Sequence, residues 1–316
     1  MTNEKTKKPA FIRFLQWLFP WKGDSAGEVF RKLVFLVAVL VFLSAAGYLG
    51  NYFYQRYHSA QIAGQISNIY YNEQPSQERI PLPDGYNIKF DNLYQINQDI
   101  KGWISLPGTP VDFPVMQAED NNYYLRRNIY KDYDNNGTPF LDYRDEILPD
   151  FQSSNLVIYG HNMKFDGVFG ALVHYNDLDF YKQHPLITFD SVYQDMQWKV
   201  VSGFYVNTRP EDDNGNVFEY QNYIDLSNPS VFKEYVDQIT KRSVVKTNID
   251  VTYGDHLLTL STCANEFKDG RFVVVARQVR EGEDPNVDVS KATYNPNTVY
   301  PEIWYQKFPD TPRPQD

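Results

Sequence analysis

The chain has 316 residues, enough for one large domain or two modest ones, and 16% of them are aromatic, which favours strands because flat rings pack well on pleated sheets. Its formal net charge of −10 argues against nucleic-acid binding by the main part of the chain. A chain of this length needs no disulfide for stability, and none can form within it, because it holds a single cysteine.

Positive charge gathers at the N-terminus. Residues 1–32 hold seven Lys or Arg against three acids, so they carry about +4 and the remainder about −14. The uncharged run that follows, residues 33–50 (LVFLVAVLVFLSAAGYLG), is close to the ~30 Å hydrocarbon thickness at ~1.5 Å per helical residue. We predict an uncleaved transmembrane helix; the alternatives are a cleaved signal peptide and a buried core helix.

The charge asymmetry also predicts an orientation. Basic residues are dense before the apolar run and sparse after it, so residues 1–32 are expected in the cytoplasm and residues from 51 onward on the extracellular face of the cell membrane. FIRFLQWLFPW, residues 11–21, either lies along the inner membrane surface or is a disordered tail.

The sequence after the apolar run predicts three further regions. Residues 51–80 form a helical linker, residues 81–280 the main domain, and residues 281–316 a proline-containing, loosely attached tail in which Trp304 and Phe308 are candidates for docking. A short helix is predicted near 90–96 and a longer one at 228–245. Strands are predicted at 103–106, 111–117, 155–160, 186–190, 196–207, 255–263 and 271–279. This pattern indicates a mainly β fold, a single antiparallel or mixed barrel.

The only cysteine lies at the end of a predicted strand. Alternation along 255–263 puts Ser261 and Cys263 on one face, and Arg271 begins the next strand. If the two strands form a hairpin, Cys263 and Arg271 lie together, where a guanidinium can stabilise a thiolate or an oxyanion. Arg277 shares the face of Arg271 but lies about 20 Å further along the strand, so it cannot serve the cysteine.

A working cysteine also needs a histidine, and the chain has five. His161 follows the apolar strand 155–160, where a strand delivers a side chain to the rim of a sheet; a satisfied structural histidine is the equal alternative. The other four are less suited, because they lie beside the apolar run, in a polar stretch, or on the face opposite the cysteine: His58, His174, His184 and His256.

Several motifs carry a family resemblance. NLVIYGHNM, FDGVFGAL, TLSTC and RFVVVAR, in that order, resemble the sortases, while KGWISLPGTPVDFPVMQAEDNNYYL and TPFLDYR resemble class B sortases in particular. The resemblance covers about residues 99–277 and includes the helix at 228–245. It implies an eight-stranded barrel with N-terminal helices and a helix before the cysteine strand. The spacing of eight residues from Cys263 to Arg271 is short for the family and leaves the loop ANEFKDG open.

The resemblance implies a membrane-anchored cysteine transpeptidase of Gram-positive bacteria. In such an enzyme Cys263 attacks the sorting motif of a secreted protein, His161 protonates the departing amine, and Arg271 holds the peptide backbone or the oxyanion. The thioester then passes to an amine of a cell-wall precursor or a pilin. Ser261, Thr262 and Asn162 are predicted to contact substrate, with ordinary structural packing as the alternative.

We predict no cofactor and no metal, because the acidic residues lack calcium-loop spacing. Two other functions remain open. A membrane-anchored cysteine peptidase, a thiol hydrolase, would use the same three residues with water as the acceptor. A non-catalytic surface-binding module would use the cysteine only for packing.

Overall fold

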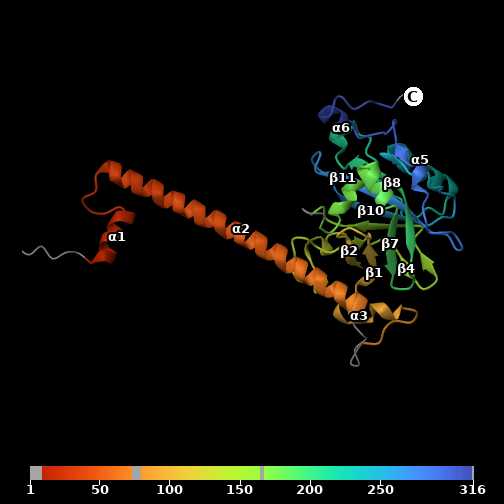
Figure 1. Ribbon diagram of the computed structural model, residues 1–316, viewed down its shortest axis with the longest axis horizontal. Coiled ribbons are helices and arrows are strands. Elements are labelled where there is room, and N and C mark those ends of the chain that lie inside the picture. Colours follow the sequence, from red (N-terminus) through yellow and green to blue (C-terminus); the bar gives the residue numbers. More distant parts are fainter. Residues whose placement is uncertain (1–8, 73–79, 164–166, 315–316) are drawn as a thin grey trace, which may run out of the picture. The chain divides into compact units, whose positions relative to one another are not determined.

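The computed structural model describes residues 9–72, 80–163 and 167–314 (Figure 1). The start of the predicted cytoplasmic segment, the end of the predicted linker and part of FDGVFGAL therefore lie outside the described residues. The chain divides into two compact units, Met1–His58 and Ser59–Asp316, which we describe separately.

The first unit contains α1 (Ala10–Leu18) and most of α2 (Ala26–Asn72). Ser25 and Glu28 form a capping box that begins α2: the Ser25 hydroxyl accepts from the Glu28 N–H at 3.3 Å, and the Glu28 carboxylate accepts from the Ser25 N–H at 3.0 Å. Lys32 Nζ donates to Asp24 and to the carbonyl oxygen of Gln16, both at 2.6 Å. These bonds join α1 to the start of α2.

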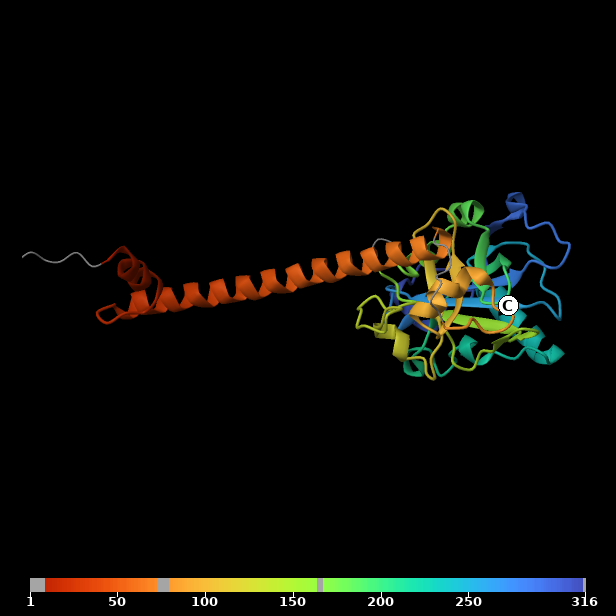
Figure 2. The same cartoon turned by 90° about the horizontal axis from the view of Figure 1, so that it is seen from below.

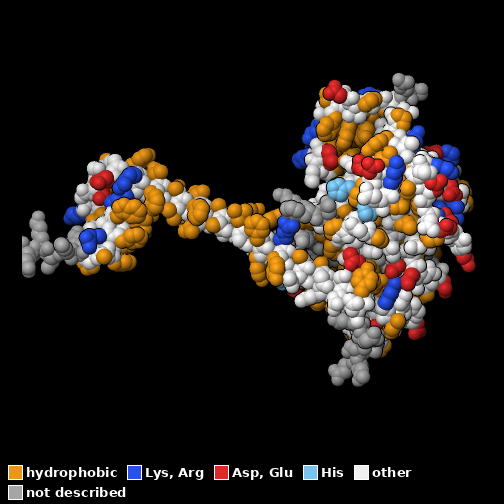
Figure 3. Space-filling model, viewed as in Figure 1, with side chains coloured by type: hydrophobic (Ala, Val, Ile, Leu, Met, Phe, Trp, Pro, Cys, Tyr) orange, Lys and Arg blue, Asp and Glu red, His pale blue; other side chains and the backbone are white. Residues whose placement is uncertain are grey.

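Hydrophobic side chains cover the outside of α2 in this unit (Figure 3). By length and composition, α2 is apolar enough to cross a membrane, and none of its most apolar window is buried in protein. The run predicted to span the membrane, residues 33–50, lies wholly within this helix.

The second unit is built on a closed barrel of eight strands in the order β1-β2-β3-β6-β10-β11-β8-β7. Its β6–β10 and β2–β3 pairs are parallel and the others are antiparallel, which confirms a mainly β, mixed barrel. The strands are β1 (Ile100–Ser105), β2 (Asp112–Met116), β3 (Phe140–Leu141), β6 (Asn155–Tyr159), β7 (Leu186–Ser191), β8 (Gln197–Asn207), β10 (Leu257–Cys263) and β11 (Gly270–Gln278).

Short elements surround the barrel, with α5 and α6 on its outside in both views (Figures 1 and 2). Asn228 caps α5 through its side chain, and Pro229 is in the first turn, as the sequence predicts. The helices are α3 (Asp91–Ile96), α4 (Leu178–Gln183), α5 (Pro229–Arg242) and α6 (Glu302–Lys307). Two small sheets pair β4 (Ile147–Leu148) with β5 (Phe151–Gln152), and β9 (Val245–Lys246) with β12 (Thr293–Tyr294).

Alternation along β10 divides its side chains between two cores. Leu258 and Leu260 are buried in the barrel cluster, while Leu257 is buried in the cluster that α5 covers. Thr259 faces α5 too, where its hydroxyl lies 2.6 Å from the hydroxyl of Tyr235. The strand that carries Cys263 is thus packed on both faces, which fixes its register.

The last residues of α2, 59–72, pack on the barrel. Tyr70 stacks on Trp103 with ring centroids 4.2 Å apart, and its hydroxyl donates to Asp190 at 3.0 Å. Ser67 donates to Asp112 at 2.8 Å. Residues 59–72, predicted as part of a linker, therefore also contribute to the core of this unit.

The residues after β11 are attached more firmly than the sequence indicated. Ala292 and Tyr305 are buried, and β12 pairs with β9. Trp304 docks on Tyr205, with ring centroids 4.6 Å apart. The predicted docking of Trp304 is confirmed, and aromatic packing, which proline content does not reveal, holds residues 292–308 on the barrel more firmly than a loose attachment.

Asp145 is a buried carboxyl group at the edge of β6. Its Oδ2 accepts from the N–H of Val157 at 2.7 Å, and its Oδ1 has no hydrogen-bond partner among the described residues. Burial raises the pKa of Asp145 to about 8, so the folded protein holds a proton there at neutral pH.

This proton predicts a pH-dependent stability. An unfolded aspartate loses its proton near pH 4, so from there to about pH 8 the folded state binds more protons, and stability falls as pH rises, by at most about 1.4 kcal/mol per pH unit. Asp145→Asn cannot ionise and should lack this part of the slope. Denaturant unfolding of both proteins from pH 5 to pH 8 measures it; parallel curves would contradict the assignment.

Candidate active site

The parallel pairing of β6 and β10 places His161 beside Cys263. The last paired positions are Tyr159 and Ser261, and the Gly160 N–H continues the ladder by donating to the carbonyl oxygen of Ser261 at 3.0 Å. His161 and Cys263 each lie two residues beyond that last pair. Two side chains about a hundred residues apart in sequence therefore reach the same rim of the barrel.

The antiparallel pairing of β10 and β11 supplies the arginine. Cys263 lies directly opposite Arg271, which confirms the predicted hairpin. The turn is closed by the Ala264 N–H, which donates to the carbonyl oxygen of Gly270 at 2.9 Å, and Asp269 has a positive φ of 55°. The seven residues between Cys263 and Arg271 are thus sufficient for a tight loop.

The ring of His161 is fixed by a backbone carbonyl. His161 Nε2 lies 2.8 Å from the carbonyl oxygen of Leu125. Because a carbonyl only accepts, Nε2 carries the proton, and in the neutral ring Nδ1 is left as the acceptor. The backbone is held as well, since the Phe169 N–H donates to the carbonyl oxygen of His161 at 3.0 Å.

Burial is the main cause that lowers the pKa of His161, and the positive charges of Arg126 and Arg271 act in the same direction. The hydrogen bond to Leu125 opposes them. The imidazole is therefore mostly neutral at pH 7, and the protonated ring is the minor form.

Three further predicted residues surround Cys263. Asn162 Nδ2 donates to the carbonyl oxygen of Cys263 at 2.8 Å, which ties the ends of β6 and β10 together. Ser261 and Thr262 are buried; the Ser261 hydroxyl lies 2.6 Å from that of Tyr220, and Thr262 Oγ1 has no hydrogen-bond partner among the described residues. Substrate contact by all three stays a prediction, and burial favours a supporting role for Ser261 and Thr262.

Sequence reasoning missed the carbonyl of Leu125 and the glycine behind it. Gly137 has a φ of 60°, and a Cβ built there would lie 2.6 Å from the carbonyl oxygens of both Tyr124 and Leu125. Only glycine combines this conformation with so close an approach. The dipeptide Asn136-Gly137, typical of turns with positive φ, was the signal available in the sequence.

A buried network supports the same rim. The Tyr159 hydroxyl donates to Asp142 at 2.8 Å, and Asp142 also accepts from Arg144 at 2.8 Å and from Asn121 at 2.9 Å. These bonds hold the end of β6, two residues before His161, against the segments beside it.

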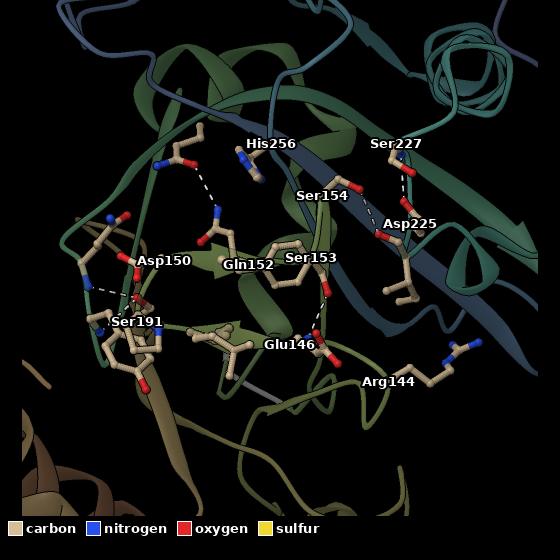
Figure 4. A pocket seen from close by; sticks show the side chains of 18 residues that line it. Arg144, Glu146, Asp150, Gln152, Ser153, Ser154, Ser191, Asp225, Ser227 and His256 are labelled. Carbon is tan, nitrogen blue, oxygen red and sulfur yellow. Dashed lines mark hydrogen bonds between the residues drawn. The ribbon is translucent and has the colours of Figure 1, made fainter. Parts of the chain in front are cut away.

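The other arginine and the other histidines lie elsewhere. Arg277 is buried and forms an ion pair with Glu283 at 2.7 Å, which is a structural role. His256 precedes β10 and so lies at the opposite end of the barrel, where it lines a cavity of about 770 Å³ with Glu146, Asp225 and other residues (Figure 4). None of His161, Cys263 and Arg271 lines that cavity. Among the described residues, no group of three or more metal-ligating side chains gathers.

Known proteins of similar sequence point to one family. A family model described as the sortase domain matches residues 104–279. Sortase B of Staphylococcus aureus (strain NCTC 8325 / PS 47) is 32% identical over 196 residues, which are 61% of this chain and 75% of that protein. Sortase B of Listeria monocytogenes serovar 1/2a is 28% identical over 252 residues, which are 78% of this chain and 96% of that protein.

Solved structures agree with the sequence relatives. The sortase B of B. anthracis in complex with AAEK1 has a TM-score of 0.61 at 30% identity, covering 72% of this chain and 99% of that one. A Staphylococcus aureus sortase B–substrate complex has a TM-score of 0.55 at 30% identity, covering 62% and 87%. A sortase B complexed with triglycine has a TM-score of 0.57 at 28% identity, covering 71% and 96%.

The role of Leu125 can be tested through Gly137. Gly137→Ala forces the Leu125 carbonyl away from His161, so the hydrogen bond that raises the imidazole pKa weakens, and the pKa of His161 should fall further. Titration of the His161 ring by NMR measures the change.

Gly215→Ala is the matched control for this test. Gly215 also has a positive φ, of 78°, but a Cβ there would meet nothing within 4 Å. Both substitutions strain the backbone, and only the one at residue 137 displaces the carbonyl. Equal titration curves in the two variants would remove Leu125 from the site.

Proposed function

This chain belongs to the sortase family, in its class B, and from that premise we propose that Cys263, His161 and Arg271 are the catalytic residues of this cysteine transpeptidase. The supporting observation is the meeting of three strand ends, with His161 beside Cys263 on parallel strands and Arg271 opposite Cys263 in the hairpin. The catalytic domain we propose is residues 81–280.

The first step is acylation. The Cys263 thiolate attacks the carbonyl carbon of the sorting motif, and Arg271, opposite it on β11, stabilises the developing oxyanion. Protonated His161 donates its proton to the departing amine, the peptide bond breaks, and a thioester forms. Because the pKa of His161 is lowered, only a small fraction of the enzyme holds the reactive pair of thiolate and imidazolium.

The second step transfers the acyl group. Neutral His161 accepts a proton from an incoming amine, which attacks the thioester and releases Cys263 as thiolate. A solved relative holds its substrate and another holds triglycine, which supports a peptide donor and an amine acceptor here. We propose secreted proteins with a C-terminal sorting motif as donors and a cell-wall precursor or a pilin as the acceptor.

We propose that the protein works at the extracellular face of the membrane. The apolar part of α2 is long enough to cross a bilayer, and the basic excess before it favours a cytoplasmic N-terminus. A secreted substrate and a cell-wall or pilin acceptor would both meet the enzyme at that surface.

The function is tested by the full chain in detergent with a library of sorting-motif peptides. We expect cleavage that an added amine, such as triglycine, accelerates, with the peptide appearing in the ligated product. Cleavage that ignores the amine and yields only the free acid would identify a cysteine peptidase instead. No cleavage and no captured thioester would identify a non-catalytic binding module.

Substitutions test the three roles. Cys263→Ala and His161→Ala should abolish turnover, and Arg271→Ala should lower kcat about 100- to 1000-fold, the cost of removing an oxyanion donor. Arg280→Ala, beyond the far end of the same strand, is the control and should turn over normally. Full activity after loss of Cys263 or His161 would refute the mechanism.

The acid role of His161 predicts a shifted pH profile in Arg126→Gln. Removing this positive charge raises the pKa of His161, so the limb on which kcat falls with rising pH should move to higher pH. Lys233→Gln, an exposed residue on α5, is the control and should leave the profile unchanged. If the falling limb of the kcat profile does not shift in Arg126→Gln, that limb does not reflect the ionisation of His161.

A further inference from the structure

We propose that residues 293–313, which we call the C-terminal brace, position the loop between Cys263 and Arg271 for catalysis, with Trp304 as its central residue. The inference rests on the proposed function, because it concerns the same cysteine and arginine. The brace lies beyond residue 279, where the match to the family model ends.

Trp304 joins the brace to the loop through aromatic packing. Its ring lies 4.6 Å from the ring of Tyr205 on β8 and 6.5 Å, edge to face, from that of Phe267 in the loop. Tyr300 also stacks on this ring, at 4.5 Å with an interplanar angle of 12°. The indole N–H donates to Thr311 at 3.1 Å, so the ring is oriented from within the brace itself.

Polar contacts connect the same segments. Lys307 Nζ donates to the carbonyl oxygen of Glu266 in the loop at 3.1 Å. The Tyr205 hydroxyl donates to Glu266 Oε1 at 3.0 Å and itself accepts from Asn176 at 2.9 Å. Glu266 is therefore fixed by β8 on one side and by α6 on the other.

The loop contacts the backbone beside both Cys263 and Arg271. Phe267 is buried against Gly270, where a Cβ would lie 2.7 Å from its ring. Gly270 directly precedes Arg271, and its carbonyl oxygen accepts both from Arg271 Nη1 at 3.0 Å and from the N–H of Ala264, the residue after Cys263. A shift of Phe267 would move the backbone on both sides of the hairpin.

The brace has anchors besides Trp304. Its β12 strand pairs with β9, and the N–H of Glu302 donates to the carboxylate of Asp213. Arg313 forms an ion pair with Glu302 at 2.7 Å and covers the ring of Tyr305 at 4.2 Å. Hydrophobic side chains gather over α6 in this part of the surface (Figure 3). Replacing Trp304 thus removes the aromatic contact with the loop and leaves the rest of the brace attached.

The test compares Trp304→Ala, Trp304→Phe and a control in the full chain. Tyr193→Ala is the control, because Tyr193 is a partly buried aromatic residue at the opposite end of the barrel, where it packs on Tyr86. We measure kcat and KM for the sorting peptide with the amine acceptor, and the alkylation rate of Cys263 against pH. As the only cysteine, Cys263 gives an unmixed signal.

We expect Trp304→Ala to lower kcat about tenfold or more with KM changed less than about twofold, because misplacement of reacting groups by 1 Å costs up to about 100-fold in rate. The rate of alkylation should change as the backbone on either side of the hairpin moves. Trp304→Phe keeps an aromatic ring and should restore most of the kcat, and Tyr193→Ala should match the wild type in both measurements.

Other outcomes overturn the brace. If kcat and the alkylation rate are unchanged in Trp304→Ala, whether or not the melting temperature falls, the C-terminal brace contributes only to stability and the proposal is refuted. Lys307→Met removes only a surface hydrogen bond, so it replaces Trp304→Ala if that variant fails to fold, and an unchanged kcat there would refute the proposal equally. An inactive wild-type chain would instead refute the proposed function.

Discussion

The geometry of the proposed active site depends on one constraint, the parallel register of β6 and β10. It alone brings His161 to Cys263, because no local contact connects residues about a hundred positions apart. A slip of one residue would turn every β10 side chain to the other face, moving Leu258 and Leu260 out of the barrel core. The apolar core and the chemistry therefore share one register, and the Asn162 bond to the carbonyl of Cys263 secures it at the rim.

Three charged or ionisable groups at that rim oppose one another. Arg271 lies opposite Cys263 and disfavours a second positive charge on His161, whose pKa burial already lowers. The Leu125 carbonyl compensates in part, because it accepts from Nε2 and favours the protonated ring. The site thus holds a mostly neutral histidine whose protonated form is favoured by one carbonyl, and in the proposed mechanism this group first donates a proton and later accepts one.

The sequence predicted much of this and missed identifiable parts. Apolar alternation and a single cysteine at a strand end were enough to place Cys263 opposite Arg271, because a hairpin is local. The pairing of β6 with β10 is not local, and only the family resemblance pointed to it. The Leu125 carbonyl was beyond reach, since every residue has one and only the fold decides which faces a histidine. Prolines after residue 281 indicated a loose tail, because composition does not show that Trp304 has Tyr205 to pack on.

The conformation of the short loop depends on the packed C-terminal residues. A loop of seven residues between Cys263 and Arg271 has little surface of its own to bury. Two of its residues also cost free energy of folding. Asp269 has a positive φ, and one buried carboxylate oxygen of Glu266 has no hydrogen-bond partner among the described residues. Such a loop holds its shape only if neighbours impose it. The ring of Trp304 and the ammonium group of Lys307 approach it from outside the barrel, so the extension provides the rigidity that the loop's own length does not.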